Sequence, residues 1–134
     1  MAPQVEEPLR RRYRLVAYLN EEMPLALQAA DLVLCRSGAS TLSELAVLGK
    51  PSILVPLPPA IGSSPQEANA EMFERRAAAE VIKDHDLTSQ ELVERVKCIL
   101  SSSARLETMA EASNSFAMPQ ATQEITAELV KIAR

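Results

Sequence analysis

The sequence predicts an α/β protein in which an open parallel sheet is covered by helices on both faces. Residues 32–35 and 53–55 are continuous apolar runs, as expected of strands buried on both sides, rather than alternating ones. Helical segments separate the strand-like segments, which is the order of βαβ units. The last third of the chain has only helical patterns. We therefore expect an open parallel sheet followed by C-terminal helices.

The composition favours a single folded domain and argues against nucleic-acid binding and metal binding. A chain of 134 residues with 47% hydrophobic residues can fold as one domain with its own core. Aromatic residues make up only 3%, tryptophan is absent and the net charge is −4, which together argue against nucleic-acid binding. Cys35 and Cys98 form no CxxC pair and have no nearby histidine, so we expect no metal site and a reducing compartment.

The first residues look like a lead-in to the domain. Residues 1–13 are polar, and we expect the domain to occupy residues 14–134. The start is acidic and proline-containing, unlike a secretory signal, and no apolar run approaches membrane-spanning length. A basic cluster lies at this boundary, for which we prefer a solvated role over contact with anionic lipid or phosphate. Its members are Arg10, Arg11, Arg12 and Arg14.

The first half of the domain alternates strands and helices. Residues 15–19 are apolar and strand-like, and residues 25–30 form a short helix with Pro24 in its first turn. After the strand at 32–35, a helix begins at Ser40 or Thr41 and ends at residue 48, before Gly49. The strand at 53–55 follows, bounded by prolines.

The second half becomes helical. A loop at 56–64, a helix at 66–76 and a strand at 80–82 complete the alternation. Thr88 and Glu91 have the spacing of a capping box, and a core-facing stripe follows in the helix that they begin. The stripe consists of Leu92, Val93, Val96, Ile99 and Leu100. We expect a weaker helix at 104–113 and a last one from Pro119, with Ile125, Leu129 and Ile132 on one face.

The turn after residue 35 has the properties of an anion site. A strand, a glycine-containing turn and a helix N-terminus bring unpaired amides and the positive end of the helix dipole together. Gly38 would let a ligand approach the backbone closely. Glu44 lies three residues after Thr41, one turn deeper on the same face, where its carboxylate could accept hydrogen bonds from two ribose hydroxyls. The pattern therefore predicts a site that binds a nucleotide.

Four ordered blocks of this sequence resemble a known family. They are LNEEM at 19–23, ADLVLCRSGASTLSEL at 30–45, GKPSILVP at 49–56 and QEANA at 66–70. In order and spacing they resemble the donor-binding region of the MurG-type N-acetylglucosaminyltransferases of glycosyltransferase family 28. The similarity runs from about residue 13 to the C-terminus, and several ordered blocks are far more specific than one glycine-containing turn.

The resemblance implies an incomplete doubly wound parallel sheet with C-terminal helices, which is the Rossmann-like, UDP-sugar-binding C-terminal half of a GT-B glycosyltransferase. Such an enzyme transfers N-acetylglucosamine from UDP-N-acetylglucosamine to a lipid-diphosphate precursor of peptidoglycan, at the inner face of the bacterial plasma membrane, in cell wall biogenesis and cell division. The family's acceptor domain, which would supply the lipid site and the catalytic base, has no counterpart in this sequence. We therefore assign no catalytic residue here, and we expect no turnover from this chain alone and no cofactor.

The resemblance also assigns binding roles by position. Glu44 would hold the ribose hydroxyls, and Gln66 would contact hydroxyls of the N-acetylglucosamine. The uracil would be framed by the backbone at Asn20, with Leu19 and Met23 beside it. The diphosphate would meet the start of the helix, at Gly38, Ala39, Ser40 and Thr41. Arg36 matches a family arginine, and the sequence leaves open whether it pairs with a carboxylate or with phosphate.

This sequence departs from the family in two places. The loop before Gln66 often carries a polar residue in the family, commonly histidine, where this chain has Pro65. The first two strands of the domain, with a glycine-rich loop, also have no counterpart here. In the usual strand order these two strands would separate residues 15–19 from residues 32–35. We expect residues 15–19 either to pair directly with 32–35 or to be displaced, or a second chain, such as another copy, to cover the open edge.

Simpler interpretations compete with several of these roles. Glu44 could be a solvated helix residue, Ser40 or Thr41 only an N-cap, and Gln66 an exposed first-turn residue. For Asn69 we prefer a bracing role through bonds to the backbone, and for His85 a surface role. At the level of function, the alternative to a transferase donor domain is a non-catalytic UDP-sugar-binding module, or a subunit that needs a partner chain.

Overall fold

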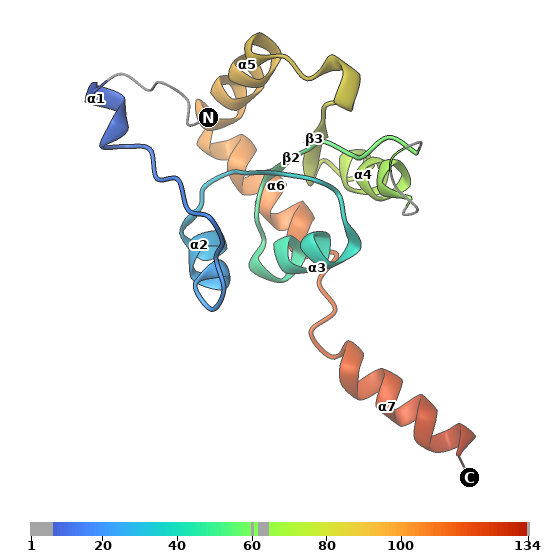
Figure 1. The fold of residues 1–134 in the computed structure, drawn as a ribbon. Helices are drawn as coiled ribbons and strands as arrows, with labels where there is room; N and C mark the ends of the chain where they lie inside the picture. Colours follow the sequence, from blue (N-terminus) through green and yellow to red (C-terminus); the bar gives the residue numbers. More distant parts are fainter. Residues whose placement is uncertain (1–6, 60, 62–64, 134) are drawn as a thin grey trace.

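The structure is a computed structural model that describes residues 7–59, 61 and 65–133 (Figure 1). The strands are β1 (Val33–Cys35), β2 (Ser52–Leu54) and β3 (Ala79–Val81). The α-helices are α1 (Glu7–Arg10), α2 (Met23–Ala29), α3 (Ala39–Leu48), α4 (Gln66–Arg75), α5 (Ser89–Leu100), α6 (Ser103–Asn114) and α7 (Ala121–Ile132). A 3₁₀ turn, η1 (Asp84–Asp86), follows β3. Of the expected loop at 56–64, residues 60 and 62–64 lie outside the described residues.

The strands form one parallel sheet in the order β1-β2-β3. In its register, Leu34 pairs with Ile53, and Ile53 pairs with Glu80. Helix α3 connects β1 to β2 and helix α4 connects β2 to β3, so each connection is a βαβ unit. The predicted α/β class and parallel sheet are therefore confirmed, with each observed strand beginning one residue earlier or later than expected.

The two faces of the sheet are covered by different helices. Leu54, which is fully buried, packs in one hydrophobic cluster with α3 residues such as Leu45 and α4 residues such as Phe73. Ile53, its neighbour in β2, points to the opposite face and packs with Ile99 of α5 and Met109 of α6. Because successive strand residues alternate between faces, one short strand anchors both layers.

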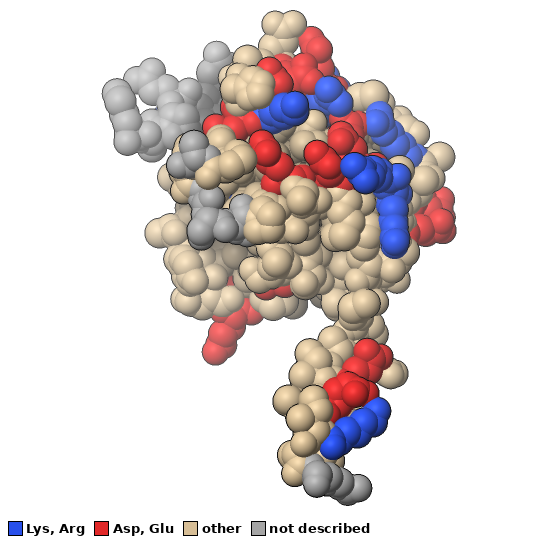
Figure 2. All heavy atoms as spheres, turned by 90° about the vertical axis from the view of Figure 1, so that its right-hand side faces the viewer, with Lys and Arg blue, Asp and Glu red and all other residues tan. Residues whose placement is uncertain are grey.

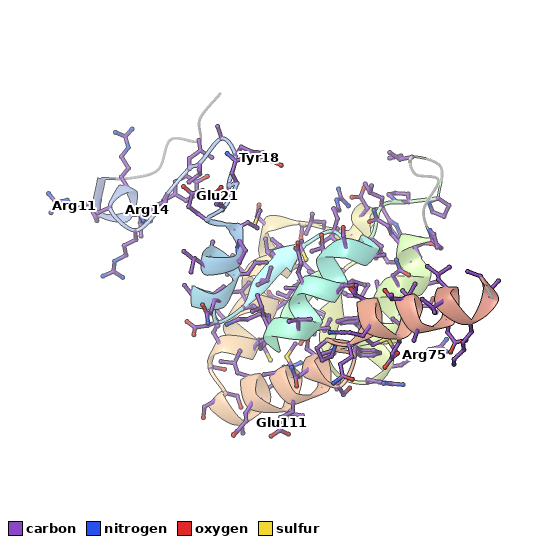
Figure 3. The ribbon with its side chains drawn as sticks, turned by 90° about the horizontal axis from the view of Figure 1, so that it is seen from below. Arg11, Arg14, Tyr18, Glu21, Arg75 and Glu111 are labelled. Atoms are coloured by element: carbon purple, nitrogen blue, oxygen red, sulfur yellow. The ribbon has the colours of Figure 1, made fainter. Side chains whose placement is uncertain are left out.

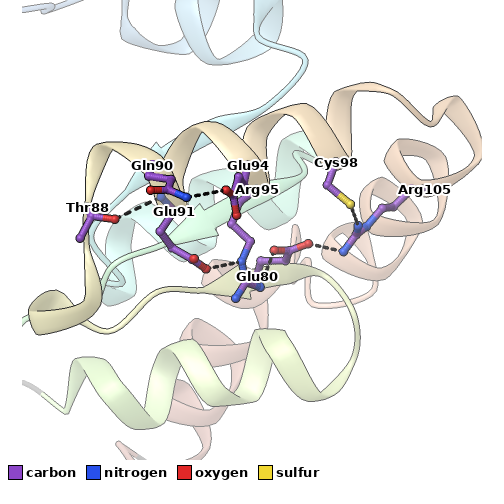
Figure 4. Close-up of polar contacts among 8 residues, drawn as sticks. All are labelled: Glu80, Thr88, Gln90, Glu91, Glu94, Arg95, Cys98 and Arg105. Atoms are coloured by element: carbon purple, nitrogen blue, oxygen red, sulfur yellow. Dashed lines mark hydrogen bonds and ion pairs between the residues drawn. The ribbon is translucent and has the colours of Figure 1, made fainter.

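Glu80 of β3 forms ion pairs with both helices that cover its side of the sheet, α5 and α6 (Figure 4). Its side chain is only 12% exposed and accepts from Arg95 Nη1 at 2.9 Å and from Arg105 Nη2. Arg95 Nε also donates to Glu91 at 2.7 Å. These hydrogen bonds, first to Glu80 and then to Glu91, raise the pKa of Arg95. A carboxylate on a half-buried strand is thus fully paired by one arginine from each covering helix.

The helix ends follow the sequence in most places. Gly49 adopts the left-handed conformation, with φ 59° and ψ 46°, and ends α3 as predicted. Thr88 Oγ1 accepts from the Glu91 backbone N–H at 3.1 Å, which confirms the predicted cap of α5, while the Glu91 carboxylate pairs with Arg95. Helix α3 begins at Ala39, one residue before the earliest predicted start, because extended Gly38 serves as its N-cap.

Residues 15–19 do not form the predicted strand. They lie outside the sheet, and Leu15 and Tyr18 are 69% and 77% exposed. A strand needs a hydrogen-bonded neighbour, and β1, at the edge of the described sheet, is paired only with β2. Of the two alternatives weighed for this segment, displacement is the one that the structure shows.

The N-terminal segment lies apart from the sheet and its helices. Residues 7–10 form the short helix α1 within the lead-in, where no helix was predicted. Arg11 and Arg14 project outward from this segment (Figure 3) and are exposed, as expected of a solvated cluster. No helix among residues 7–59, 61 and 65–133 is long and apolar enough to cross a membrane.

Two helices bury less than their patterns predict. In α5, Ile99 is buried, but Val93 and Leu100 are 48% and 47% exposed, so the predicted stripe is narrower than five residues. Helix α7 extends away from the rest of the chain (Figure 1). Ile125, Leu129 and Ile132 share one face of α7, as predicted, and that face is exposed. Figure 2 shows the charged residues of α7 together along one edge of the helix, and Glu124 and Glu128 line the same surface hollow as the apolar face.

The packing of β1 predicts different reactivities for the two cysteines. Burial raises the pKa of the Cys35 thiol to about 11, whereas the free-peptide value is about 8.5. Cys35 should therefore stay protonated in the folded chain at pH 8 to 9. Because iodoacetamide reacts with thiolates, exposed Cys98 should be alkylated much faster, as followed by peptide mass spectrometry.

The raised pKa of Cys35 also makes the free energy of unfolding depend on pH. The folded state favours the neutral thiol, so the contribution of Cys35 is present below pH about 8.5 and is lost as pH rises toward 11.

For the alkylation experiment, the chain unfolded in urea is the control, because both cysteines should react alike there. Equal rates in the folded chain would contradict the raised pKa of the half-buried Cys35 thiol.

Candidate functional site

The candidate site lies where β1 ends and α3 begins. In open parallel sheets, ligands bind outside the carboxyl ends of the strands. Here the first intrahelical bond runs from Leu42 N–H to Gly38 O at 3.0 Å, so the amides of residues 39–41 have no carbonyl of α3 to bond. Ala39 and Ser40 are exposed, and the cap residue has no side chain that could occupy these amides. The helix start is therefore available to an anion.

Gly38 leaves open space at this helix start. A Cβ placed on Gly38 would meet nothing within 4 Å, and its backbone is ordinary extended chain, with φ −66° and ψ 144°. Every residue can adopt that conformation, so the backbone does not require glycine here. The interpretation of Ser40 or Thr41 as the N-cap is wrong, because both lie inside the helix.

A pocket of about 360 Å³ lies between α2 and α3. It brings together three of the predicted site residues: Glu44 from α3, Met23 from the start of α2, and Asn20 from the segment before it. The rest of its lining is mainly apolar, and consists of Pro24, Leu27, Val47 and Leu48. Leu19, predicted beside Asn20, is half-buried but does not line the pocket.

Lys50 holds α2 in place beside α3. Its Nζ donates to the carbonyls of Gln28 at 2.7 Å and Ala30 at 2.9 Å, at the C-terminal end of α2. A lysine ammonium there satisfies carbonyls that the helix leaves unpaired and interacts favourably with the helix dipole. Since α2 supplies one wall of the pocket, Lys50 helps to define the pocket without lining it.

Arg36 bridges the ends of the strands. Its Nη1 lies 2.5 Å from Asp84 Oδ1 and donates to the carbonyls of Val55, at 3.1 Å, and Pro56, at 3.4 Å. Of the two partners left open by the sequence, the structure shows the carboxylate. Contact between Arg36 and phosphate stays a prediction.

Ser37 joins the turn after β1 to the start of α4. It is fully buried, and its Oγ donates to the carbonyl of Gln66 at 2.7 Å. Asn69 Nδ2 donates in return to the carbonyl of Ser37 at 3.1 Å, which confirms the bracing role predicted for Asn69. Gln66 Oε1 accepts from the N–H of Leu57 at 3.0 Å. Gln66 is therefore engaged within the chain through both its backbone and its side chain.

Sequence reasoning missed three residues that build this site: Ser37, Lys50 and Asp84. Each acts through a partner far away in the sequence, so no local pattern marks it. Even Lys50, which directly follows the C-cap of α3, bonds to carbonyls at the end of α2 and not to those of α3.

The polar residues fit a ligand that carries an anion and hydroxyl groups. Within the described part of the chain, no group of three or more His, Cys, Asp or Glu side chains could hold a metal ion. His85 lies beside Asp86, Nε2 to Oδ2 3.3 Å, and both side chains are largely exposed, as a surface role requires. The amides at the start of α3 can bind a phosphate, and exposed Glu44 can accept hydrogen bonds from sugar hydroxyls.

Comparison with known families finds a match over most of the chain. The model of the glycosyltransferase family 28 C-terminal domain matches residues 3–125. The chain is 44% identical over 119 residues to the UDP-N-acetylglucosamine--N-acetylmuramyl-(pentapeptide) pyrophosphoryl-undecaprenol N-acetylglucosamine transferase of Desulforudis audaxviator, covering 89% of this chain and 32% of the relative. It is 42% identical over 113 residues to the protein of the same name from Solibacter usitatus, and this match covers 84% of this chain and 30% of that relative.

A solved structure shows the same fold. The crystal structure of Acinetobacter baumannii MurG superposes with a TM-score of 0.73 and 32% identity. The superposition covers 84% of this chain and 32% of that one. The chain thus spans about a third of the length of the proteins that it matches.

The two glycines that flank α3 should respond oppositely to substitution. Gly38→Ser should leave the free energy of unfolding unchanged or raise it by about 0.3 kcal/mol, because the extended backbone suits serine and serine is a good N-cap. Gly49→Ala should lower it by about 1 kcal/mol or more, because φ is +59° and the new Cβ would lie 3.3 Å from the Ala110 carbonyl oxygen. Urea unfolding measures both, and a destabilised Gly38→Ser variant would contradict the observed start of α3.

Proposed function

The chain belongs to the glycosyltransferase family 28 C-terminal domain family, and from this membership we propose that it binds the sugar donor of a transferase. The donor would be UDP-N-acetylglucosamine, and the sugar would pass to a lipid-linked peptidoglycan precursor. The names of the relatives from Desulforudis and Solibacter support this substrate pair. We propose residues 14–134 as the donor-binding part, preceded by residues 1–13.

One observation carries the proposal: α3 contributes a carboxylate to a mainly apolar pocket, and no described side chain caps the start of the same helix. In the proposed complex, Glu44 accepts hydrogen bonds from the ribose hydroxyls. The uracil lies near Asn20 and Met23, with Leu19 behind them. The amides from Gly38 through Ala39 and Ser40 to Thr41 receive the diphosphate, and Gln66 reaches hydroxyls of the N-acetylglucosamine through its side-chain amide.

The proposed contribution to catalysis is electrostatic. When the bond between sugar and diphosphate breaks, negative charge develops on the UDP leaving group. Amides fixed at the start of α3 would stabilise that charge without reorganising. Arg36, at the end of β1, would add positive potential, which its pair with Asp84 reduces.

The acceptor site and the catalytic base belong, in this proposal, to the part of the relatives that this chain does not span. The full enzyme would act in peptidoglycan synthesis and cell division, in the cytoplasm at the inner face of the plasma membrane. A second chain, such as another copy, against the free edge of β1 stays a proposal, which the oligomeric state in solution would test.

Binding of UDP to the 134-residue chain, measured by calorimetry, tests the donor site. Glu44→Ala should weaken binding by about 1.5–3 kcal/mol, because charge-assisted hydrogen bonds to the ribose are lost. Gly38→Ser should also weaken binding, because its hydroxyl would compete for the amides of α3.

Glu111→Ala is the matched control, since it removes one exposed carboxylate from α6, outside the pocket. Its affinity for UDP should equal that of the unchanged chain. No measurable UDP binding by the unchanged chain, or equal affinities for Glu44→Ala and Glu111→Ala, would refute the assignment.

The 134-residue chain should show no transferase turnover when it is supplied with UDP-N-acetylglucosamine and a lipid-diphosphate acceptor. The physical reason is that the proposed site binds the donor but offers no base beside the acceptor. The measurement is mass spectrometry of the glycolipid product, with the Glu44→Ala chain purified in parallel to reveal contaminating enzyme. Product formed by the unchanged chain and not by this variant would contradict the division of labour.

A further inference from the structure

We propose that Ser37 and Asn69 are positioning residues, which hold the start of α3 in the orientation that its amides need to bind the diphosphate. The proposal rests on the proposed function for the identity of the ligand. Neither residue was predicted to touch the donor. Their role follows from the hydrogen bonds that they form with each other's segments.

Two hydrogen bonds run in opposite directions between the two helix starts. The hydroxyl of Ser37 donates to the carbonyl of Gln66, the first residue of α4, and the side-chain amide of Asn69 donates to the carbonyl of Ser37. The first bond fixes Ser37 through its side chain and the second through its backbone. A third bond, from the N–H of Leu57 to Gln66 Oε1, extends this fixation to the segment after β2.

The position of Ser37 in the chain makes this fixation relevant to binding. Ser37 lies two residues before Ala39, the first residue of α3, and only Gly38 separates them. Its side chain is fully buried and already bonded, so it cannot itself reach a ligand above the helix start. Without these two hydrogen bonds, the turn at residues 36–38 would be fixed mainly by β1 before it and α3 after it. The amides of residues 39–41 would then no longer point in one direction. Preorganised donors lose much of their effect when they are displaced by about 1 Å.

Helix α3 offers a matched control at its other end. There the Oγ of Ser113, which is also fully buried, donates to the carbonyl of Leu45 at 3.3 Å. Asn114 Nδ2 donates to the carbonyls of Ala46 at 3.2 Å and Val47 at 3.5 Å. A serine and an asparagine thus hold each end of the same helix through its backbone or that of the adjoining turn. Only the N-terminal pair adjoins the proposed diphosphate site.

The experiment compares four variants of the full chain: Ser37→Ala, Asn69→Ala, Ser113→Ala and Asn114→Ala. Calorimetry measures the affinity for UDP, and urea unfolding measures stability. All four should be destabilised to a similar extent, since each loses hydrogen bonds to the backbone. Ser37→Ala and Asn69→Ala should weaken UDP binding roughly three- to tenfold, and the C-terminal pair less than about twofold. Asn69→Asp, which keeps the shape but cannot donate, should behave like Asn69→Ala.

Amide hydrogen exchange of Leu42, whose N–H donates to the carbonyl of Gly38 at the start of α3, is the second readout in the unliganded chain. It should accelerate in Ser37→Ala and Asn69→Ala and not in the other two. If the unchanged chain fails to bind UDP, the proposed function fails, and the exchange rates still decide whether this pair fixes the helix start. If one of the two variants does not fold, the other carries the same test. Equal exchange rates and equal affinities across both pairs would overturn the proposal.

Discussion

Ile53 and Leu54 of β2 point to opposite faces of the sheet, and each is fully buried. A three-residue strand buried on both sides leaves its neighbours little freedom, because β1 and β3 must pair with it in parallel and helices must cover both faces. Parallel pairing in turn places the ends of all three strands at one edge of the sheet. The turn after β1, the start of α3 and the Arg36–Asp84 pair all lie at that edge because β2 is central.

At that edge, stability and binding make opposite demands on α3. A serine at position 38 would cap the helix, yet the chain has glycine there, with open space above it and, behind it, amides that have no carbonyl of α3 to bond. The missing stabilisation is supplied elsewhere: Gly49 ends the helix in a left-handed conformation, and hydrogen bonds from Ser113 and Asn114 satisfy carbonyls in its last turn. Such an arrangement is consistent with a helix start that is kept free for a ligand.

The sequence could predict the features that depend on neighbouring residues, but not those that depend on contacts between distant segments. The buried strands, the glycine that ends α3 and the cap at Thr88 follow from neighbouring residues and were found. Residues 15–19 have a strand's composition, but a strand also needs a partner, and composition cannot show whether one is present. The bonds of Ser37 to α4 and of Lys50 to α2 join segments about 20 to 30 residues apart, so they became visible only in the structure. Three site residues predicted from the family, Asn20, Met23 and Glu44, do line one pocket.

The pairing of Arg36 suggests how the edge could recognise a diphosphate. Nη1 of Arg36 donates to Asp84 and to two carbonyls, so part of its charge is offset within the chain, while the side chain stays half-exposed. Neutral amides at the start of α3 then become the main donors to an anion in the proposed complex, and their strength depends on direction more than on net charge. A site that relies on directed dipoles needs a rigid frame, whereas a mobile cation could adjust to its ligand. This is the physical reason why the hydrogen bonds of Ser37 and Asn69, rather than another exposed arginine, would determine how well the helix start binds.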